Sequence, residues 1–121
     1  MNMTTQQIPR EQWRNYFDDL GKNYHGWAAT VEVMEQDLGD QPLEEGLAFQ
    51  GISFEEAGTD AGNIRVEIGD TGSAFQTHHI DGPRTVRVTQ SQPGAEIDIE
   101  IEAEDGATLV RLRPRTEMGR A

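Results

Sequence analysis

The chain has 121 residues, enough for one domain with one hydrophobic core and too few for two. Its formal net charge is −12, from 22 acidic residues against 10 lysines and arginines, and such a charge repels nucleic-acid phosphates and anionic membranes. It contains no cysteine, which excludes disulfides, thiol catalysis and zinc–thiolate sites.

No stretch approaches the roughly 18 apolar residues that a membrane span requires, and the N-terminus lacks the pattern of a secretory signal. We therefore expect a soluble cytoplasmic protein. Lys22 is its only lysine. An acidic, lysine-poor surface suits a high-salt cytoplasm, where salt screens the repulsion between carboxylates. Adaptation to salt is therefore one hypothesis, and a simply acidic protein is the other.

A helix is predicted near the N-terminus. Residues 1–7 are polar and expected to be flexible, and Pro9 then suits the first turn of a helix, where its missing N–H costs little. An apolar stripe on one helix face consists of Trp13, Phe17, Leu20 and Tyr24. Either Gly21 or Gly26 is expected to end the helix.

After the helix the apolar spacing changes to every second residue, which indicates strands. Turn residues recur about every ten positions, as in antiparallel folds. The expected strands are 27–33, 47–56, 64–68, 74–80, 84–90, 96–104 and 107–113. Loops or turns are expected at 35–42, 57–63, 69–73, 81–83 and 91–95. Gly51 predicts a bulge or a sharp bend within the second strand.

These elements predict an α+β fold. The N-terminal helix packs on a mostly antiparallel sheet of about seven strands, curled into a partial barrel or sandwich. We expect residues 8–114 to form a single globular domain, preceded by the flexible residues 1–7 and followed by a flexible C-terminal tail, 115–121.

Acidic residues occupy every second position from 96 to 104. Asp105-Gly106 is a strong hairpin signal, and as a two-residue turn it places Ile101 opposite Val110. The cross-strand ion pairs that follow are Glu100 with Arg111 and Asp98 with Arg113. Each contributes about 0.2–1 kcal/mol on an exposed face, so the acidic ladder is interpreted as the solvent face of a hairpin.

A calcium site on Glu96, Glu102 and Glu104 is disfavoured. Alternate side chains along a flat strand lie about 6.6–7 Å apart, whereas calcium requires six to eight converging oxygens.

His78 and His79, with Asp81 close by, are residue types that bind metal ions. Neighbouring side chains of a strand point to opposite faces, so both histidines reach one metal only if the strand ends or bulges there. We favour one exposed and one half-buried histidine. We expect no cofactor, and a metal-dependent enzyme built on these residues is the weaker hypothesis.

Trp13 and Trp27 are expected in the core, one from the helix and one from the first strand. The alternative places them as walls of a ligand pocket between helix and sheet.

Several segments together carry a family resemblance. They are IPREQW at 8–13, HGWAATVEV at 25–33 and DLG at 37–39, then LAFQGISF, TVRVTQ, the acidic strand, DG and LVRLRP. Over most of residues 8–114 the chain resembles an uncharacterised bacterial family of small soluble proteins, a domain of unknown function. That family has no assigned activity, so the resemblance carries over no site residue and implies only a stand-alone bacterial domain.

The sequence shows no catalytic constellation. We therefore expect a non-enzymatic structural or interaction protein, a monomer or weak homodimer whose strand edges pair with a protein partner. The alternative is a small-molecule or peptide binding module with its pocket between helix and sheet.

Overall fold

The computed structural model describes residues 4–35, 39–56, 58, 61–69, 76–92, 94–104 and 106–114, without the side chains of 4, 35 and 39–46. In chain order the elements are β1 (Thr4–Gln7), the 3₁₀ turn η1 (Arg10–Gln12), α1 (Trp13–Asn23), β2 (Ala28–Glu35), β3 (Gly39–Phe54), β4 (Ile64–Ile68), β5 (Gln76–Ile80), β6 (Pro83–Gln90), β7 (Ile97–Ala103) and β8 (Gly106–Arg113).

The predicted N-terminal helix is confirmed. The turn η1 begins directly after Pro9 and continues into α1, whose buried face carries Trp13, Phe17 and Leu20. The helix ends at Asn23, between the two glycines considered as its end. Gly26, with φ of 88°, then turns the chain into β2.

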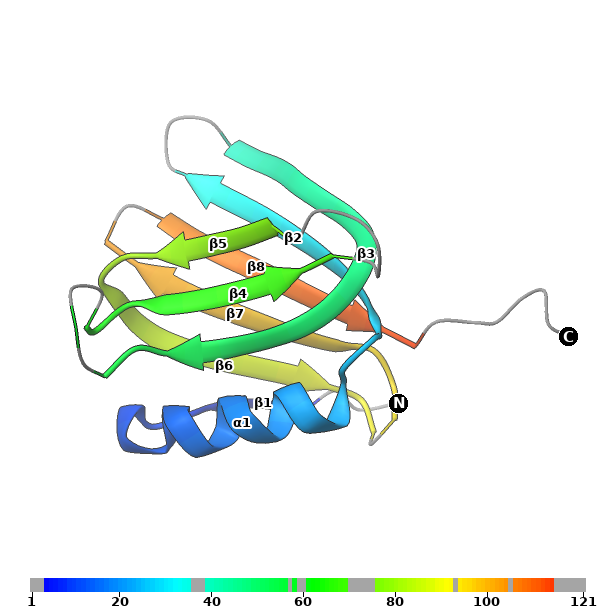
Figure 1. The fold of residues 1–121 in the computed structure, drawn as a ribbon, viewed down its shortest axis with the longest axis horizontal. Coiled ribbons are helices and arrows are strands. Elements are labelled where there is room, and N and C mark those ends of the chain that lie inside the picture. The colour runs from blue at the N-terminus through cyan, green and yellow to red at the C-terminus, as the bar shows by residue number, and fades with distance from the viewer. Residues whose placement is uncertain are drawn as a thin grey trace, which may run out of the picture.

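The strands form one antiparallel sheet in the order β1-β6-β7-β8-β2-β3-β4-β5. It has eight strands rather than about seven, and it does not close, so β1 and β5 are its end strands. The sheet curls until β4 and β5 lie over β7 and β8, and α1 runs along one end of the two layers (Figure 1). The predicted helix on a curled antiparallel sheet is therefore confirmed.

The long strand β3 carries the chain from one layer to the other. It pairs with β2 up to Ala48 and with β4 from Phe49 onward, with a register shift between Phe49 and Gly51. The bulge predicted at Gly51 is confirmed. β3 also includes residues 39–42, which were expected as loop. Pro42 is tolerated there because, within the described part of the chain, β2 is the only strand beside this part of β3.

Residues 4–7 form β1 and pair with β6, whereas their polar composition predicted a flexible segment. The described side chains of β1, at positions 5–7, are all exposed, so no apolar alternation marks this strand in the sequence. Thr5 and Thr89 join their hydroxyls across the pair at 2.9 Å. The predicted tail, 115–121, lies outside the described residues.

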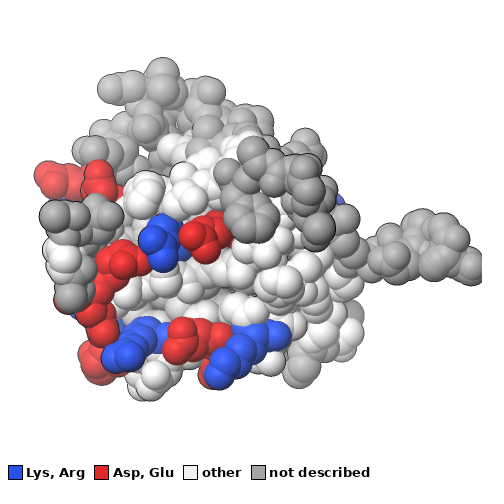
Figure 2. All heavy atoms as spheres, viewed as in Figure 1, with Lys and Arg blue, Asp and Glu red and all other residues white. Residues whose placement is uncertain are grey.

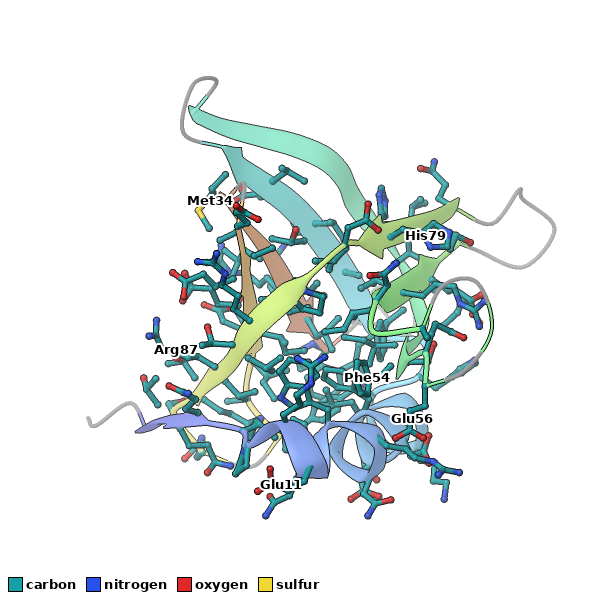
Figure 3. The ribbon with its side chains drawn as sticks, turned by 90° about the vertical axis from the view of Figure 1, so that its left-hand side faces the viewer. Glu11, Met34, Phe54, Glu56, His79 and Arg87 are labelled. Atoms are coloured by element: carbon teal, nitrogen blue, oxygen red, sulfur yellow. The ribbon has the colours of Figure 1, made fainter. Side chains whose placement is uncertain are left out.

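The core lies between the two layers and is closed at one end by α1. Its largest fully buried side chains are Trp13, Phe17, Phe49, Ile64, Ile68, Ile97, Ile99, Ile101 and Leu112. In the side view, Met34 and Arg87 lie on one outer face and His79 on the other, with the core side chains between them (Figure 3). Among the described residues, no helix has the length and apolar character needed to cross a membrane.

The β7–β8 register differs from the predicted one. Ile101 lies opposite Thr108 rather than Val110, and β8 begins at Gly106, which was expected in the turn; Asp105 lies outside the described residues. The predicted pairs were Glu100 with Arg111 and Asp98 with Arg113, and both are wrong. A shift of two residues keeps every side chain on its face, so the apolar pattern fits both registers equally well.

Arginines still neutralise much of the acidic ladder. Arg111 lies 2.9 Å from Asp98 and 3.9 Å from Glu96, and Arg113 lies 3.7 Å from Glu96. Glu100 has Arg87 of β6 at 3.9 Å. The ladder is therefore largely an ion-paired outer face. Acidic and basic side chains also lie side by side on the face in Figure 2. Arg65 of β4 is 3.4 Å from Glu55.

Candidate functional site

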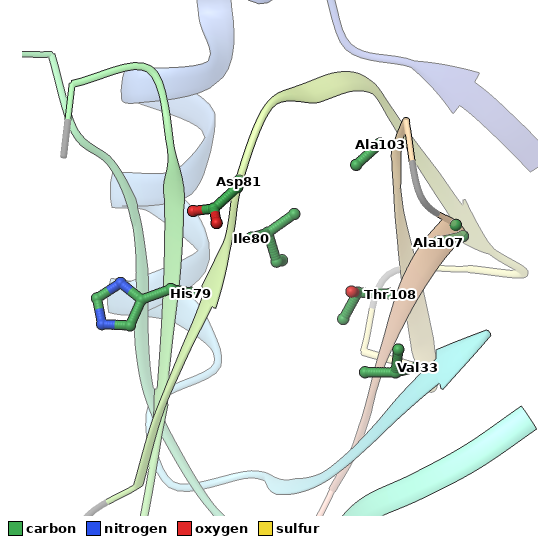
Figure 4. Close-up of a pocket in the computed structure, with 8 residues that line it drawn as sticks. Val33, His79, Ile80, Asp81, Ala103, Ala107 and Thr108 are labelled. Atoms are coloured by element: carbon green, nitrogen blue, oxygen red, sulfur yellow. The ribbon is translucent and has the colours of Figure 1, made fainter. Parts of the chain in front are cut away.

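A cavity of about 310 Å³ lies beside the end strand β5, between it and the β7–β8 hairpin. We call it the seam cavity (Figure 4). Its lining residues are His79, Ile80 and Asp81 on one side and Val33, Ala103, Gly106, Ala107 and Thr108 on the other.

The β5 wall of the seam cavity combines one aliphatic side chain with strand backbone. Ile80 points into the cavity, whereas the ring of His79 and the carboxylate of Asp81 point to the opposite side of the chain (Figure 4). This alternation follows from the period of two along a strand. The backbone at this wall belongs to a strand that has a neighbour on one side only among the described strands.

Thr108 is the polar side chain of the opposite wall. It lies on the inner face of β8, in line with Val110 and Leu112, and only 8% of it is exposed. Its hydroxyl points toward the cavity (Figure 4) and has no side-chain hydrogen bond to any described residue. The cavity is open to solvent, which reaches this hydroxyl, so a ligand with a donor or acceptor takes the place of water there.

A second hollow of about 370 Å³ adjoins the seam cavity and shares three of its residues. The hollow is lined by Met34, Arg84, Glu102, Ala103, Glu104, Gly106 and Ala107. The second hollow holds the carboxylates of Glu102 and Glu104 against the guanidinium of Arg84, and Asp81, at the border of the seam cavity, adds a carboxylate that points outward. The surroundings of the two hollows therefore favour a positively charged ligand.

The structure does not bring the two histidines together. His78 is half-buried, His79 is exposed, and the alternation of β5 turns them to opposite faces. Among the described residues, no group of three His, Asp or Glu side chains is arranged to hold a metal ion. His79 and Asp81 border the seam cavity, but neither side chain points into it.

The two tryptophans occupy the helix end of the molecule, and neither lines the seam cavity or the second hollow. Trp13 is 1% exposed, donates from Nε1 to the carbonyl of Ile8 at 2.9 Å and meets Phe54 edge-on. Trp27 is half-buried, with its ring edge-on to Tyr24 at a centroid distance of 4.5 Å. Both tryptophans therefore serve packing in this structure.

Two groups among the described residues have clearly shifted pKa values. Burial raises the pKa of the Tyr16 phenol, and the nearby Tyr24 raises it further. A hydrogen bond to Asp98 raises the pKa of the Arg111 guanidinium. Neither group lines the seam cavity, so these shifts reflect packing and ion pairing elsewhere.

Residues 4–120 match the family described as "Family of unknown function (DUF5335)". The chain belongs to this family. A protein of Aquifex aeolicus (strain VF5), described as an uncharacterized protein, is 28% identical over 113 residues, which are 93% of this chain and 95% of that protein. No solved structure matches. The resemblance to a family of unknown function is thus confirmed, and none of these matches names a ligand.

Sequence reasoning missed Thr108 and Ala103 as site residues of this DUF5335 protein. Both stand at inward positions of alternating strands, where apolar residues of full size are the rule. A threonine and an alanine in such positions are the signal that the core is incomplete at the seam.

Proposed function

We propose that this DUF5335 protein is a non-enzymatic binding module that takes up its ligand in the seam cavity. The observation that carries the proposal is the hydroxyl of Thr108, a residue only 8% exposed, which points into the cavity and lacks a side-chain hydrogen bond among the described residues. Apolar walls with a few polar groups that fix orientation are the usual composition of a ligand site.

The size of the cavity limits what it holds. Ligand pockets span about 300–1,000 Å³, and this one, at about 310 Å³, stands at the lower end. It accommodates a small molecule, or one group of a larger ligand whose remainder stays outside.

The arrangement supports binding rather than a reaction. Nucleophilic catalysis requires a nucleophile within hydrogen-bond reach of a base. The titratable side chains that border the cavity, His79 and Asp81, point away from it, and within the described part of the chain neither is hydrogen-bonded to Thr108.

The test is thermal unfolding with a panel of small aliphatic alcohols and amines on three proteins. Ala103→Leu fills the seam cavity from β7, and Ala61→Leu, at an exposed position, adds the same atoms elsewhere. A ligand at one hundred times its Kd stabilises the native state by about 2.7 kcal/mol. We expect a saturable rise in Tm for the wild type and Ala61→Leu, and none for Ala103→Leu.

Two results contradict the proposal: no compound raises the Tm of the wild type, or a compound raises that of Ala103→Leu equally. Circular dichroism first establishes that Ala103→Leu is folded. If it is not, Thr108→Val replaces it, and loss of the hydroxyl is expected to weaken binding about tenfold.

A further inference from the structure

We infer that the ligand of the seam cavity is an extended peptide with basic side chains, which adds to β5 as a further strand and inserts one aliphatic side chain into the cavity. The inference rests on the proposed function for the location of the site, and it adds the class of ligand and its mode of binding.

The first observation is the outer edge of β5. Among the described residues, this strand ends the strand order and pairs only with β4, through all five residues from Gln76 to Ile80. A strand paired on one side leaves the N–H and C=O groups of alternate residues available to another strand. Charged residues and proline commonly block such edges, and β5, with the sequence QTHHI, contains no lysine, arginine, carboxylate or proline.

The second observation is that the seam cavity lies directly beside that edge. Three consecutive residues of the β5 segment, 79–81, form one wall, and three consecutive residues of β8, 106–108, form part of the other. A peptide laid along β5 therefore crosses the cavity. Its side chains alternate between the cavity and solvent, the arrangement in which main-chain hydrogen bonds supply affinity and a pocket supplies specificity.

The cavity determines which side chain enters. Ile80 and Val33 offer aliphatic walls, and the small side chain of Ala103 leaves room between them. The volume suits one side chain better than a whole drug-sized ligand. Thr108 then hydrogen-bonds to the peptide backbone or to a threonine at the inserted position.

The charge around the seam cavity determines which peptide residues flank the inserted side chain. Asp81 and Glu104 are exposed, and neither has an ion-pair partner among the described residues. Glu102, next to them, accepts a hydrogen bond from Thr85 at 3.1 Å. Lysine or arginine at the solvent-facing positions of the peptide pairs with these carboxylates. A second copy of this chain is a poor occupant, because each copy carries a net charge of −12.

The experiment selects binders from a displayed library of random heptapeptides, with wild type as bait and Ala103→Leu for counter-selection. We expect the enriched sequences to alternate, with valine, isoleucine or threonine at every second position and lysine or arginine between them. Enrichment of acidic or proline-rich sequences overturns the inference.

The enriched peptides are then synthesised with single N-methyl groups along the chain, and their affinities are measured by fluorescence anisotropy. In a strand, successive N–H groups point to opposite sides. The N-methyl groups at one set of alternate positions therefore face β5, and those at the other set face away from it. We expect about a tenfold loss of affinity for the first set and little change for the second. Equal effects at all positions rule out strand addition.

The outcomes also separate this inference from the proposed function. If small molecules stabilise the wild type but not Ala103→Leu, and no peptide is enriched, the seam cavity binds ligands and the peptide inference is wrong. If neither small molecules nor peptides bind, both proposals are wrong.

Discussion

Arg111 on β8 donates two hydrogen bonds to the carboxylate of Asp98 directly opposite on β7, from Nε to Oδ1 at 2.9 Å and from Nη2 to Oδ2 at 3.3 Å. This bidentate pair is the tightest ion pair of the outer face and belongs to the observed register alone. The predicted register paired Arg111 with Glu100 instead.

We predict that Asp98→Asn lowers the free energy of unfolding by about 0.5–1 kcal/mol at low salt, and by less in molar salt. The loss is small because the side chains are partly solvent-exposed, 27% for Asp98 and 37% for Arg111. Urea unfolding measures it, with Glu104→Gln as the control because that exposed carboxylate has no ion-pair partner among the described residues. An equal loss in both variants contradicts the pair's role.

The β7–β8 hairpin also illustrates the limit of pattern reasoning. Alternation correctly placed Ile97, Ile99 and Ile101 inside and the carboxylates outside, but it does not distinguish two registers that differ by two residues. The turn predicted from Asp105-Gly106 lies one position too far toward the C-terminus, because Gly106 already pairs with Ala103 as the first residue of β8. Only the contacts across the sheet, such as that between Arg111 and Asp98, decide between the registers.

Two glycines near the end of α1, Gly21 and Gly26, differ in whether their backbone conformation requires glycine. Gly26 has φ of 88°, which side chains rarely adopt, and its N–H donates to Phe49 at 2.8 Å; Gly21 lies inside α1 with open space around it. We predict that Gly26→Ala destabilises the protein by about 1 kcal/mol, whereas Gly21→Ala stabilises it by about 0.5–1 kcal/mol. Thermal unfolding of both variants checks the opposite signs, and a loss at both positions contradicts them.

Solvent reaches the Thr108 hydroxyl through the seam cavity, so this group carries little stability cost in the absence of ligand. We predict that Thr108→Val changes the free energy of unfolding by no more than about 0.5 kcal/mol, because the hydroxyl has no side-chain hydrogen bond to a described residue that the substitution would remove. Thr89→Val is the comparison, since it removes a hydroxyl bonded to Thr5 and is expected to destabilise. Chemical denaturation measures both, and destabilisation by Thr108→Val indicates that its hydroxyl is already satisfied.

The raised pKa of Tyr16 makes the stability of the fold decline at alkaline pH. Burial raises its pKa above the ordinary value of about 10, so the unfolded chain loses this proton at lower pH than the folded one. The stabilisation is complete below about pH 10 and is lost as the pH rises through the folded pKa. We predict that Tyr16→Phe flattens the decline in stability above pH 10. The check is urea unfolding at a series of alkaline pH values, and an unchanged decline contradicts the prediction.

Net charge predicts a response to salt. The repulsion within a chain of charge −12 is screened by salt, so we expect Tm to rise from low salt into molar KCl. An equal rise in NaCl assigns the effect to screening rather than to a specific cation. A flat or falling curve contradicts a surface adapted to salt.

The sequence predicted the parts of the fold in which one face is apolar, and it predicted the site poorly. The helix stripe and the bulge at Gly51 follow from local patterns. β1 does not, because its described side chains are exposed and its pairing with β6 is long-range. The seam cavity depends on where the curl of the sheet stops, which brings Ile80 and Thr108 together from segments that are distant in sequence.

The central claim is that ligands bind in the seam cavity and not beside the tryptophans. The most direct measurement is NMR of the methyl groups of Ile80, Ala103 and Thr108 and of the indole N–H groups of Trp13 and Trp27, during titration with a compound that raises the Tm. We predict saturable shifts in those three methyl signals with the indole signals unchanged. Shifts confined to the indoles would place the site between helix and sheet and contradict the account.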